Sequence, residues 1–302
     1  MAADNKEQVS TVRRAKHGGV LTVLFTIISI LWIAPILIVI LNSFKRKAFI
    51  FRYPFGISSS KITDGWSEFA EGVKRMFCGF LNYQNGVKTT NFFSCFGNSL
   101  FITVGSVLLI VLCCSMCAWY IVRVKTKGTK IMYTLCLFSM IVPFQMVMFT
   151  LSKFANMLHL SNPLGIIIVY LGFGAGLAVF MFTGFVKSIS LEIEEAAMID
   201  GCTPLQTFFL VVFPILKPTT VTVAILEAMW VWNDYLLPSL VLNINKYKTI
   251  PIAVQYLKQS HGQIDWGAMM AVLVLAILPI VIFYIACQKY IIEGVLAGAV
   301  KG

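Results

Sequence analysis

Six long apolar segments alternate with polar segments along the chain. Each is about 20 residues or longer, which is the length that an α-helix needs to cross the hydrocarbon core of a bilayer. Because lipid offers no hydrogen-bond partners to the backbone, such segments predict helices rather than irregular chain. The pattern therefore predicts an all-α, polytopic membrane protein with both termini on the same side. The predicted spans are 19–42, 99–122, 131–151, 163–186, 218–240 and 266–288.

The polar segments divide the rest of the chain. We expect an N-terminal segment 1–18, one six-helix membrane domain over 19–290 and a tail over 291–302, because no repeat and no Pro- or Ser-rich linker marks a second domain. The first apolar run is longer than the apolar core of a secretory signal, so we expect it to remain in the mature protein. The two largest connections are a loop, 43–98, and a turn, 187–217.

The 43–98 loop contains an amphipathic pattern. Apolar residues recur at helical spacing between Trp66 and Phe77, behind Thr63 and Asp64 as candidate caps. This predicts a surface helix, which either lies on the membrane interface or meets a soluble partner. Cys78 and a second loop cysteine, Cys95, are a candidate disulfide pair.

Composition supports the membrane assignment. Of 302 residues, 58% are hydrophobic and 12% are charged, against roughly 45–50% and about 25% in soluble domains. Too few polar residues are present to cover a water-soluble globule. The net charge of +11 is explained by basic residues that flank membrane helices, and no basic cluster interleaved with stacking aromatics points to nucleic acid.

Charge alone does not decide the orientation. Lys and Arg balance in total between the two sides, but they are densest in the short 123–130 connection and just before the first span, which favours a cytoplasmic N-terminus. Lys45, Arg46 and Lys47 oppose it.

The turn between the fourth and fifth spans is rich in acids, with four of the chain's thirteen acidic residues between Glu192 and Asp200. It predicts two short helices at an angle. Ser190 is placed to cap the first, and its early glutamates suit the positive end of the helix dipole. Gly201 is the natural stop, since glycine adopts the left-handed conformation freely.

The second short helix has its own start and stop signals. Thr203 is a candidate N-cap, Pro204 fits the first helical position, and Gln206 completes a capping box. Pro214 and Pro218 are expected to end the helix.

The small pair Ala196-Ala197, flanked by acids, allows a close approach to a groove on another protein. A simple hairpin that joins two spans is the alternative interpretation.

Beyond these local signals, the turn resembles the EAA loop of binding-protein-dependent ABC importer permeases. That pattern is Glu-Ala-Ala, three residues, Gly, nine residues, then aliphatic-x-Leu-Pro. It is met here by Glu195-Ala196-Ala197, Gly201 and Val211-Val212-Phe213-Pro214, with phenylalanine in place of leucine. The likeness covers nearly the whole chain and is closest to the carbohydrate branch, the maltose-type second permease subunit. Further matches are Asn98-Ser99-Leu100, Trp232-Asn233-Asp234-Tyr235, Trp266-Gly267-Ala268 and Gly298-Ala299-Val300-Lys301-Gly302.

The resemblance implies the fold of a type I ABC importer permease with cytoplasmic termini, in the cell membrane of a bacterium. It implies a transport subunit rather than an enzyme, for a carbohydrate and more specifically an oligosaccharide. The expected partners are a second homologous permease in a heterodimer, two ATP-binding subunits and an extracellular solute-binding protein. ATP and magnesium would be bound by those ATPase subunits, since this chain contains no G-x-x-x-x-G-K-[ST] phosphate loop. The residues expected to couple to the ATPase are Glu194, Glu195, Ala196, Ala197, Asp200, Gly201, Pro204 and Pro214.

The fifth span contains polar residues where lipid disfavours them. Two readings stay open: a polar stripe that lines a sugar path, or hydrogen bonds between helices. Glu227 and Asp234 are seven residues apart and would share one face of a helix. An ion-coupled secondary transporter that uses these two acids is the alternative function. The candidate path residues are Glu227, Trp230, Trp232, Asn233 and Asp234.

Three other features have structural interpretations. Gly172, Gly174 and Gly176 predict close helix packing in the fourth span, and Pro143 predicts a kink in the third. Three cysteines within 113–117 lack His or carboxylate neighbours, so we interpret them as buried small residues and expect no metal site.

Overall fold

The computed structural model describes residues 18–257 and 265–299, so the predicted N-terminal segment, apart from Gly18, lies outside the described residues. Within those ranges the chain is helical and contains no β-strand; one isolated antiparallel bridge joins Lys45 and Phe77. The predicted all-α fold is confirmed. The described residues form two compact units, one that ends at Asn82 and one that begins at Tyr83.

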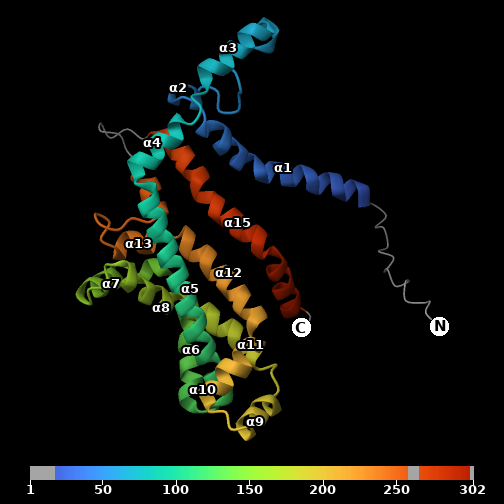
Figure 1. Cartoon of the computed structure of the whole chain (residues 1–302), viewed down its shortest axis with the longest axis vertical. Helices are drawn as coiled ribbons and strands as arrows, with labels where there is room; N and C mark the ends of the chain where they lie inside the picture. The colour runs from blue at the N-terminus through green and yellow to red at the C-terminus, as the bar shows by residue number, and fades with distance from the viewer. Residues whose placement is uncertain (1–17, 258–264, 300–302) are drawn as a thin grey trace, which may run out of the picture. The chain divides into compact units, whose positions relative to one another are not determined.

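The helices follow the order of the predicted spans (Figure 1). The first unit contains α1 (Gly18–Ser43), α2 (Lys47–Ile50), the 3-10 turn η1 (Ile62–Asp64) and α3 (Trp66–Met76), and α4 (Leu81–Thr90) crosses the boundary. The second contains α5 (Phe92–Arg123), α6 (Lys127–Ile141), α7 (Phe144–Met157), α8 (Pro163–Val186), α9 (Leu191–Ile199), α10 (Pro204–Gln206), the π-helical segment η2 (Thr207–Val212), α11 (Phe213–Ile215), α12 (Lys217–Asn233), α13 (Leu236–Val241), α14 (Ile250–Gln255) and α15 (Trp266–Ala299).

Four of the described helices, α1, α5, α8 and α15, are long and apolar enough to cross a membrane, and the number rises to six if each bent pair is one span. The third predicted span is such a pair, because the chain bends by 108° between α6 and α7, next to Pro143. The kink predicted from that proline is confirmed; proline cannot continue the hydrogen-bond ladder of α6. Since α15 runs to Ala299, no helix end separates the predicted tail 291–302 from the sixth span.

In the first unit, α1 leaves almost all its apolar side chains exposed. The chain just after it is fixed by Lys45, whose side chain is fully buried. Its ammonium donates to the carbonyls of Tyr53 and Pro54, at 2.8 and 3.1 Å, and burial lowers its pKa. Lys45, which opposed a cytoplasmic N-terminus in the charge pattern, is therefore a structural residue rather than a headgroup contact.

The predicted surface helix is present as α3, an eleven-residue helix. The prediction for its cap was wrong: Thr63 and Asp64 belong to η1, and Gly65, with φ of 113°, precedes α3 without a side-chain cap. The candidate disulfide is not formed. Cys78 and Cys95 are both free, and each thiol donates to a backbone carbonyl, at 3.3 and 3.2 Å respectively.

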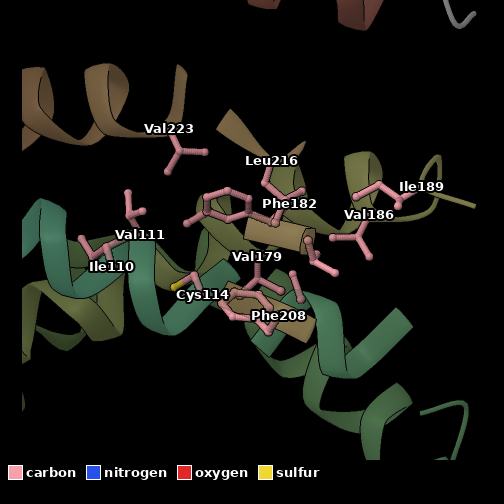
Figure 2. Packing of buried hydrophobic residues seen from close by; sticks show 13 residues of the cluster. Ile110, Val111, Cys114, Val179, Phe182, Val186, Ile189, Phe208, Leu216 and Val223 are labelled. Carbon is pink, nitrogen blue, oxygen red and sulfur yellow. The ribbon is translucent and has the colours of Figure 1, made fainter. Parts of the chain in front are cut away.

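In the second unit, α5 packs along α8, and α12 packs against both. Figure 2 shows the core that joins them, where Ile110 and Cys114 of α5 meet Phe182 of α8 and Val223 of α12. Phe208 of η2 belongs to the same core. The core thus reaches from the membrane helices into the acidic turn. The position of that turn is therefore fixed by side-chain packing as well as by the chain connection.

The glycine-rich segment of α8 packs closely, as predicted. A methyl group on Gly174 would lie 2.6 Å from Ile110 Cδ1, and one on Gly176 would lie 2.5 Å from Met140 Cγ of α6. Gly172 faces open space. Of the cysteines predicted to be buried, Cys114 is in the core, whereas Cys113 is exposed.

Candidate functional site

The acidic turn forms the helix-turn-helix that the sequence predicted, at one end of the second unit (Figure 1). Ser190 caps α9, its hydroxyl accepting from the amide of Glu192 at 3.3 Å. α9 ends before Gly201, which has φ of 87°, a left-handed conformation in which any other residue would be strained.

The second helix starts as predicted. Thr203 and Gln206 form a capping box, with Pro204 at the first helical position. Its end was predicted wrongly, because Pro214 lies within α11 and the chain bends by 77° only at Leu216. Pro214 has no amide hydrogen to donate. It is accommodated because the preceding η2 is π-helical, and the amide of Phe213 donates to the carbonyl of Phe208, five residues back.

The most firmly held acid of the turn is Glu194, which is 1% exposed. Arg123, at the end of α5, donates to its Oε1 from Nε at 3.0 Å and from Nη2 at 2.6 Å. Trp119, one turn earlier, donates from Nε1 to Oε2 at 2.9 Å. Arg123 Nη2 also donates to the carbonyl of Ile189 at 3.1 Å. These bonds fix α9 to the end of α5.

Glu194 therefore does not lie on the surface, where a contact with another subunit was expected. A carboxylate with this many donors is satisfied inside the protein and has no reason to face water. Ala197, one turn later on the same face of α9, is buried as well. The other expected coupling residues are exposed: Glu195, Ala196, Asp200, Gly201, Pro204 and Pro214.

α9 thus has two faces. Its inner face is held by Glu194, and its outer face carries Glu195 and Ala196 together with Ile199, which is 85% exposed. Leu205 at the start of the second helix is 59% exposed. Apolar side chains this exposed on a short ordered helix are typical of an interface with another protein.

Trp119 and Arg123 were not predicted from the sequence as partners of the acidic turn. The sequence pattern that could have revealed them is a tryptophan and an arginine four residues apart at the end of a span, which lie on the same helix face. They are at the same side of the membrane as Glu194. Only the contact itself reveals the pairing, since 71 residues separate Arg123 from Glu194.

Glu227 and Asp234, the two acids predicted to share a helix face, do not do so. α12 stops at Asn233, and Asp234 has an extended backbone. Its Oδ1 accepts from the amides of Leu236 and Leu237 at 2.9 and 3.4 Å, and its Oδ2 accepts from the hydroxyl of Tyr170 at 3.0 Å. Asp234 starts α13 and ties it to α8, which explains why the predicted helix breaks there.

Two of the predicted path residues are buried. Glu227 is 2% exposed and lies against Gly174, where an added methyl group would be 2.9 Å from its Oε2. Trp232 is 8% exposed, and its Nε1 donates to the carbonyl of Ala276 in α15 at 3.4 Å. Trp232 thus joins α12 to α15, whereas the Oε2 of Glu227 is buried and has no hydrogen-bond partner among the described residues.

The remaining two path residues are accessible. Trp230 is 41% exposed, and its ring meets Tyr170 edge-on, with centroids 5.4 Å apart. Asn233 is exposed, and its Nδ2 donates to the carbonyl of Met229 at 2.7 Å. Together with Leu226 and Met229 they form one exposed stripe of α12.

The part of the chain that contains the acidic turn and α12 matches a known protein family. Residues 110–296, which contain α9, η2 and α12, match the family model described as the binding-protein-dependent transport system inner membrane component. The chain is 38% identical over 281 residues to the probable starch degradation products transport system permease protein AmyC of Thermoanaerobacterium thermosulfurigenes, covering 93% of this chain and 96% of that protein.

Two further likenesses agree. The chain is 34% identical over 284 residues to the multiple sugar-binding transport system permease protein MsmG of Streptococcus mutans, covering 92% of this chain and 95% of that protein. Its fold matches a chain in the crystal structure of a bacterial ABC transporter involved in the import of the acidic polysaccharide alginate, with a TM-score of 0.71 and 22% identity, over 94% of this chain and 99% of that one.

Proposed function

The chain belongs to the family of inner membrane components of binding-protein-dependent transport systems, and from this premise we propose that it imports an oligosaccharide and couples to an ATPase through the outer face of α9. It is an ABC importer permease of the bacterial inner membrane, a transport subunit rather than an enzyme. Membership favours ATP-driven import over the ion-coupled alternative. A permease of this family works with a substrate-binding protein, an ATPase and a second permease.

The finer assembly is part of the proposal. A second, homologous permease would form a heterodimer with this chain, two ATPase subunits would bind ATP and magnesium, and the solute-binding protein would be extracellular. The acidic turn and both termini would then be cytoplasmic. The proposal of an oligosaccharide rests on relatives named for starch degradation products and for multiple sugars.

The observation that carries the coupling proposal is the division of α9 into two faces. The inner face is tied to α5 through Glu194 and Arg123, so a force on the outer face reaches a membrane helix directly. The outer face offers Glu195 for a charge contact, Ala196 for close approach and Ile199 for an apolar contact.

The test is made on the assembled transporter in proteoliposomes. We expect Glu195→Ala to lower sugar uptake about tenfold, the loss of one charge-assisted contact, without a change in the thermal midpoint. Glu68→Ala removes the same charge from exposed α3 and is the control. A photo-crosslinking residue at position 199 should capture the ATPase, and one at Leu158, 65% exposed at the end of α7, should not. Full uptake by Glu195→Ala, without capture at position 199, would refute this coupling surface.

We further propose that the exposed stripe of α12, rather than its acids, lines the sugar path. Aromatic rings and amides are suited to the faces and hydroxyls of a sugar, and Trp230 and Asn233 supply them. Asn233→Ala should raise the KM for uptake and leave assembly intact. Unchanged uptake and affinity would remove Asn233 from the path.

A further inference from the structure

A pocket of about 520 Å³ lies where α5 ends, α6 begins and α8 ends. It is at the same membrane face as the acidic turn, because Arg123 lines it and also binds Glu194. Its lining contains no acidic residue. The four cationic residues that line it are Arg123, Lys125, Lys130 and Lys187.

The positive charge of this pocket is in excess. Arg123 is neutralised by Glu194, its ion-pair partner at 2.6 Å. Lys125, Lys130 and Lys187 are exposed, and the Lys187 ammonium lies 6.0 Å from the centre of the Tyr133 ring, which also lines the pocket. Three ammonium groups around one concavity attract an anion.

A buried hydroxyl of the pocket also lacks a partner. Thr183 of α8 is 1% exposed and lines the pocket, and its Oγ1 forms no hydrogen bond with any described residue. An unpaired buried hydroxyl is costly, so such groups in proteins are normally satisfied. An oxygen-rich group in the pocket would supply the missing acceptor.

The surroundings of the pocket are those of a lipid headgroup. It lies at the ends of the membrane helices α5 and α8, which is where headgroups meet a protein. From it, α6 carries an exposed apolar stripe of Ile131, Leu135 and Phe138, which are 61%, 63% and 58% exposed and share one helix face. A free anion would make no contact with this apolar stripe, whereas the acyl chains of a lipid would cover it.

We propose that the pocket binds the phosphate of an anionic phospholipid, whose acyl chains lie along α6. Lys125, Lys130 and Lys187 hold the phosphate oxygens, and Thr183 donates to one of them. The bound charge then lies next to the Arg123–Glu194 pair that fixes α9. On the proposed function this leaflet is the inner one, but lipid binding itself does not depend on transport.

The experiment uses the full chain with the subunits that co-purify with it, in nanodiscs of phosphatidylcholine and phosphatidylglycerol in equal parts. Native mass spectrometry then measures which lipid is retained. The wild type is expected to retain phosphatidylglycerol, and Lys130→Gln with Lys187→Gln to weaken retention about 30-fold, for the loss of two lysine contacts. Lys127→Gln removes an exposed charge of α6 that does not line the pocket and should change nothing.

The proposal would be overturned by equal retention of phosphatidylglycerol by the double variant, by an equal loss of retention in Lys127→Gln, or by equal retention of both lipids. Displacement of phosphatidylglycerol by inorganic phosphate at millimolar concentration would also overturn it, and would assign the pocket to a free anion instead.

Thr183→Val keeps the shape of the side chain and removes the hydroxyl, so a several-fold weaker retention of phosphatidylglycerol is expected. Retention is read without transport, so a failure here is distinct from a failure of the coupling proposal.

Discussion

Two regions of the second unit, the acidic turn that precedes α12 and the break that follows it, use carboxylates in the same way but with different consequences for the chain. Before α12, Glu194 of the acidic turn is buried against Arg123 and Trp119 of α5. After it, Asp234 is bound by Tyr170 of α8. In both regions an acid that was expected to act on a partner or a substrate instead ties one element of this chain to another.

The difference lies in what the tie does to the helix. Glu194 lies within α9 and leaves it intact, so its neighbours Glu195 and Ala196 keep an ordered outer face. Asp234 binds the amides of α13, and α12 ends at that point. A bonded acid inside a helix thus leaves an ordered surface beside it, whereas a bonded acid at a helix boundary ends the helix.

The largest effect on this comparison is expected from Arg123→Ala. It leaves Glu194 buried without its cation, a change that costs about 3–5 kcal/mol. The thermal midpoint of the purified assembly should fall markedly, and α9 should become accessible to protease.

Glu195→Ala, which removes an exposed carboxylate of the same helix, is the control and should melt like the wild type. If Arg123→Ala also melted like the wild type, the tie between α9 and α5 would carry no stability.

The next effect is expected from Gly174→Ala in α8, where α8 packs against Glu227 of α12. The added methyl group would lie 2.6 Å from Ile110 and 2.9 Å from Glu227 Oε2, and such overpacking costs about 1–3 kcal/mol. Gly172→Ala, two residues away in open space, should be neutral or stabilising because alanine favours the helix by up to about 1 kcal/mol. Equal melting of the two variants would refute close packing of α8 on Glu227.

The sequence predicted the local structure of the acidic turn well and its contacts poorly. Ser190, Gly201 and the Thr203–Gln206 pair act on residues no more than a few positions away, so their roles follow from spacing. The burial of Glu194 depends on Arg123, 71 residues earlier, and no local pattern encodes it. Family resemblance pointed to the turn as a whole and did not separate its inner from its outer acids.

The same reason explains the errors in α12. A seven-residue spacing places Glu227 and Asp234 on one face only if the helix is continuous. The bonds from Leu236, Leu237 and Tyr170 break that continuity at Asp234. The Pro143 kink, in contrast, was predictable because proline acts on its own backbone.

A smaller effect is expected from Tyr170→Phe, which removes the hydroxyl that donates to Asp234. A hydrogen bond to a charged group contributes about 1.5 kcal/mol or more, but the amides of α13 still satisfy Oδ1. The thermal midpoint should fall modestly, and the tryptophan fluorescence of the chain should change because the Trp230 ring packs on Tyr170. Tyr133→Phe, on α6 away from Asp234, is the matched control; an equal fall in its midpoint would mean that the loss is not specific to this bond.

The smallest effect is expected from Thr203→Ala in the acidic turn. It removes the acceptor for the amide of Gln206, and the loss of an N-cap costs about 1 kcal/mol. Because the second helix is also held by buried Phe208, we expect local fraying, measured by hydrogen exchange at residues 203–206, with little change in the midpoint. Thr203→Ser, which keeps the cap, should restore protection. If exchange spread instead through α9, the two short helices would be one cooperative unit, and the tie of Glu194 to α5 would not be enough to hold α9 alone.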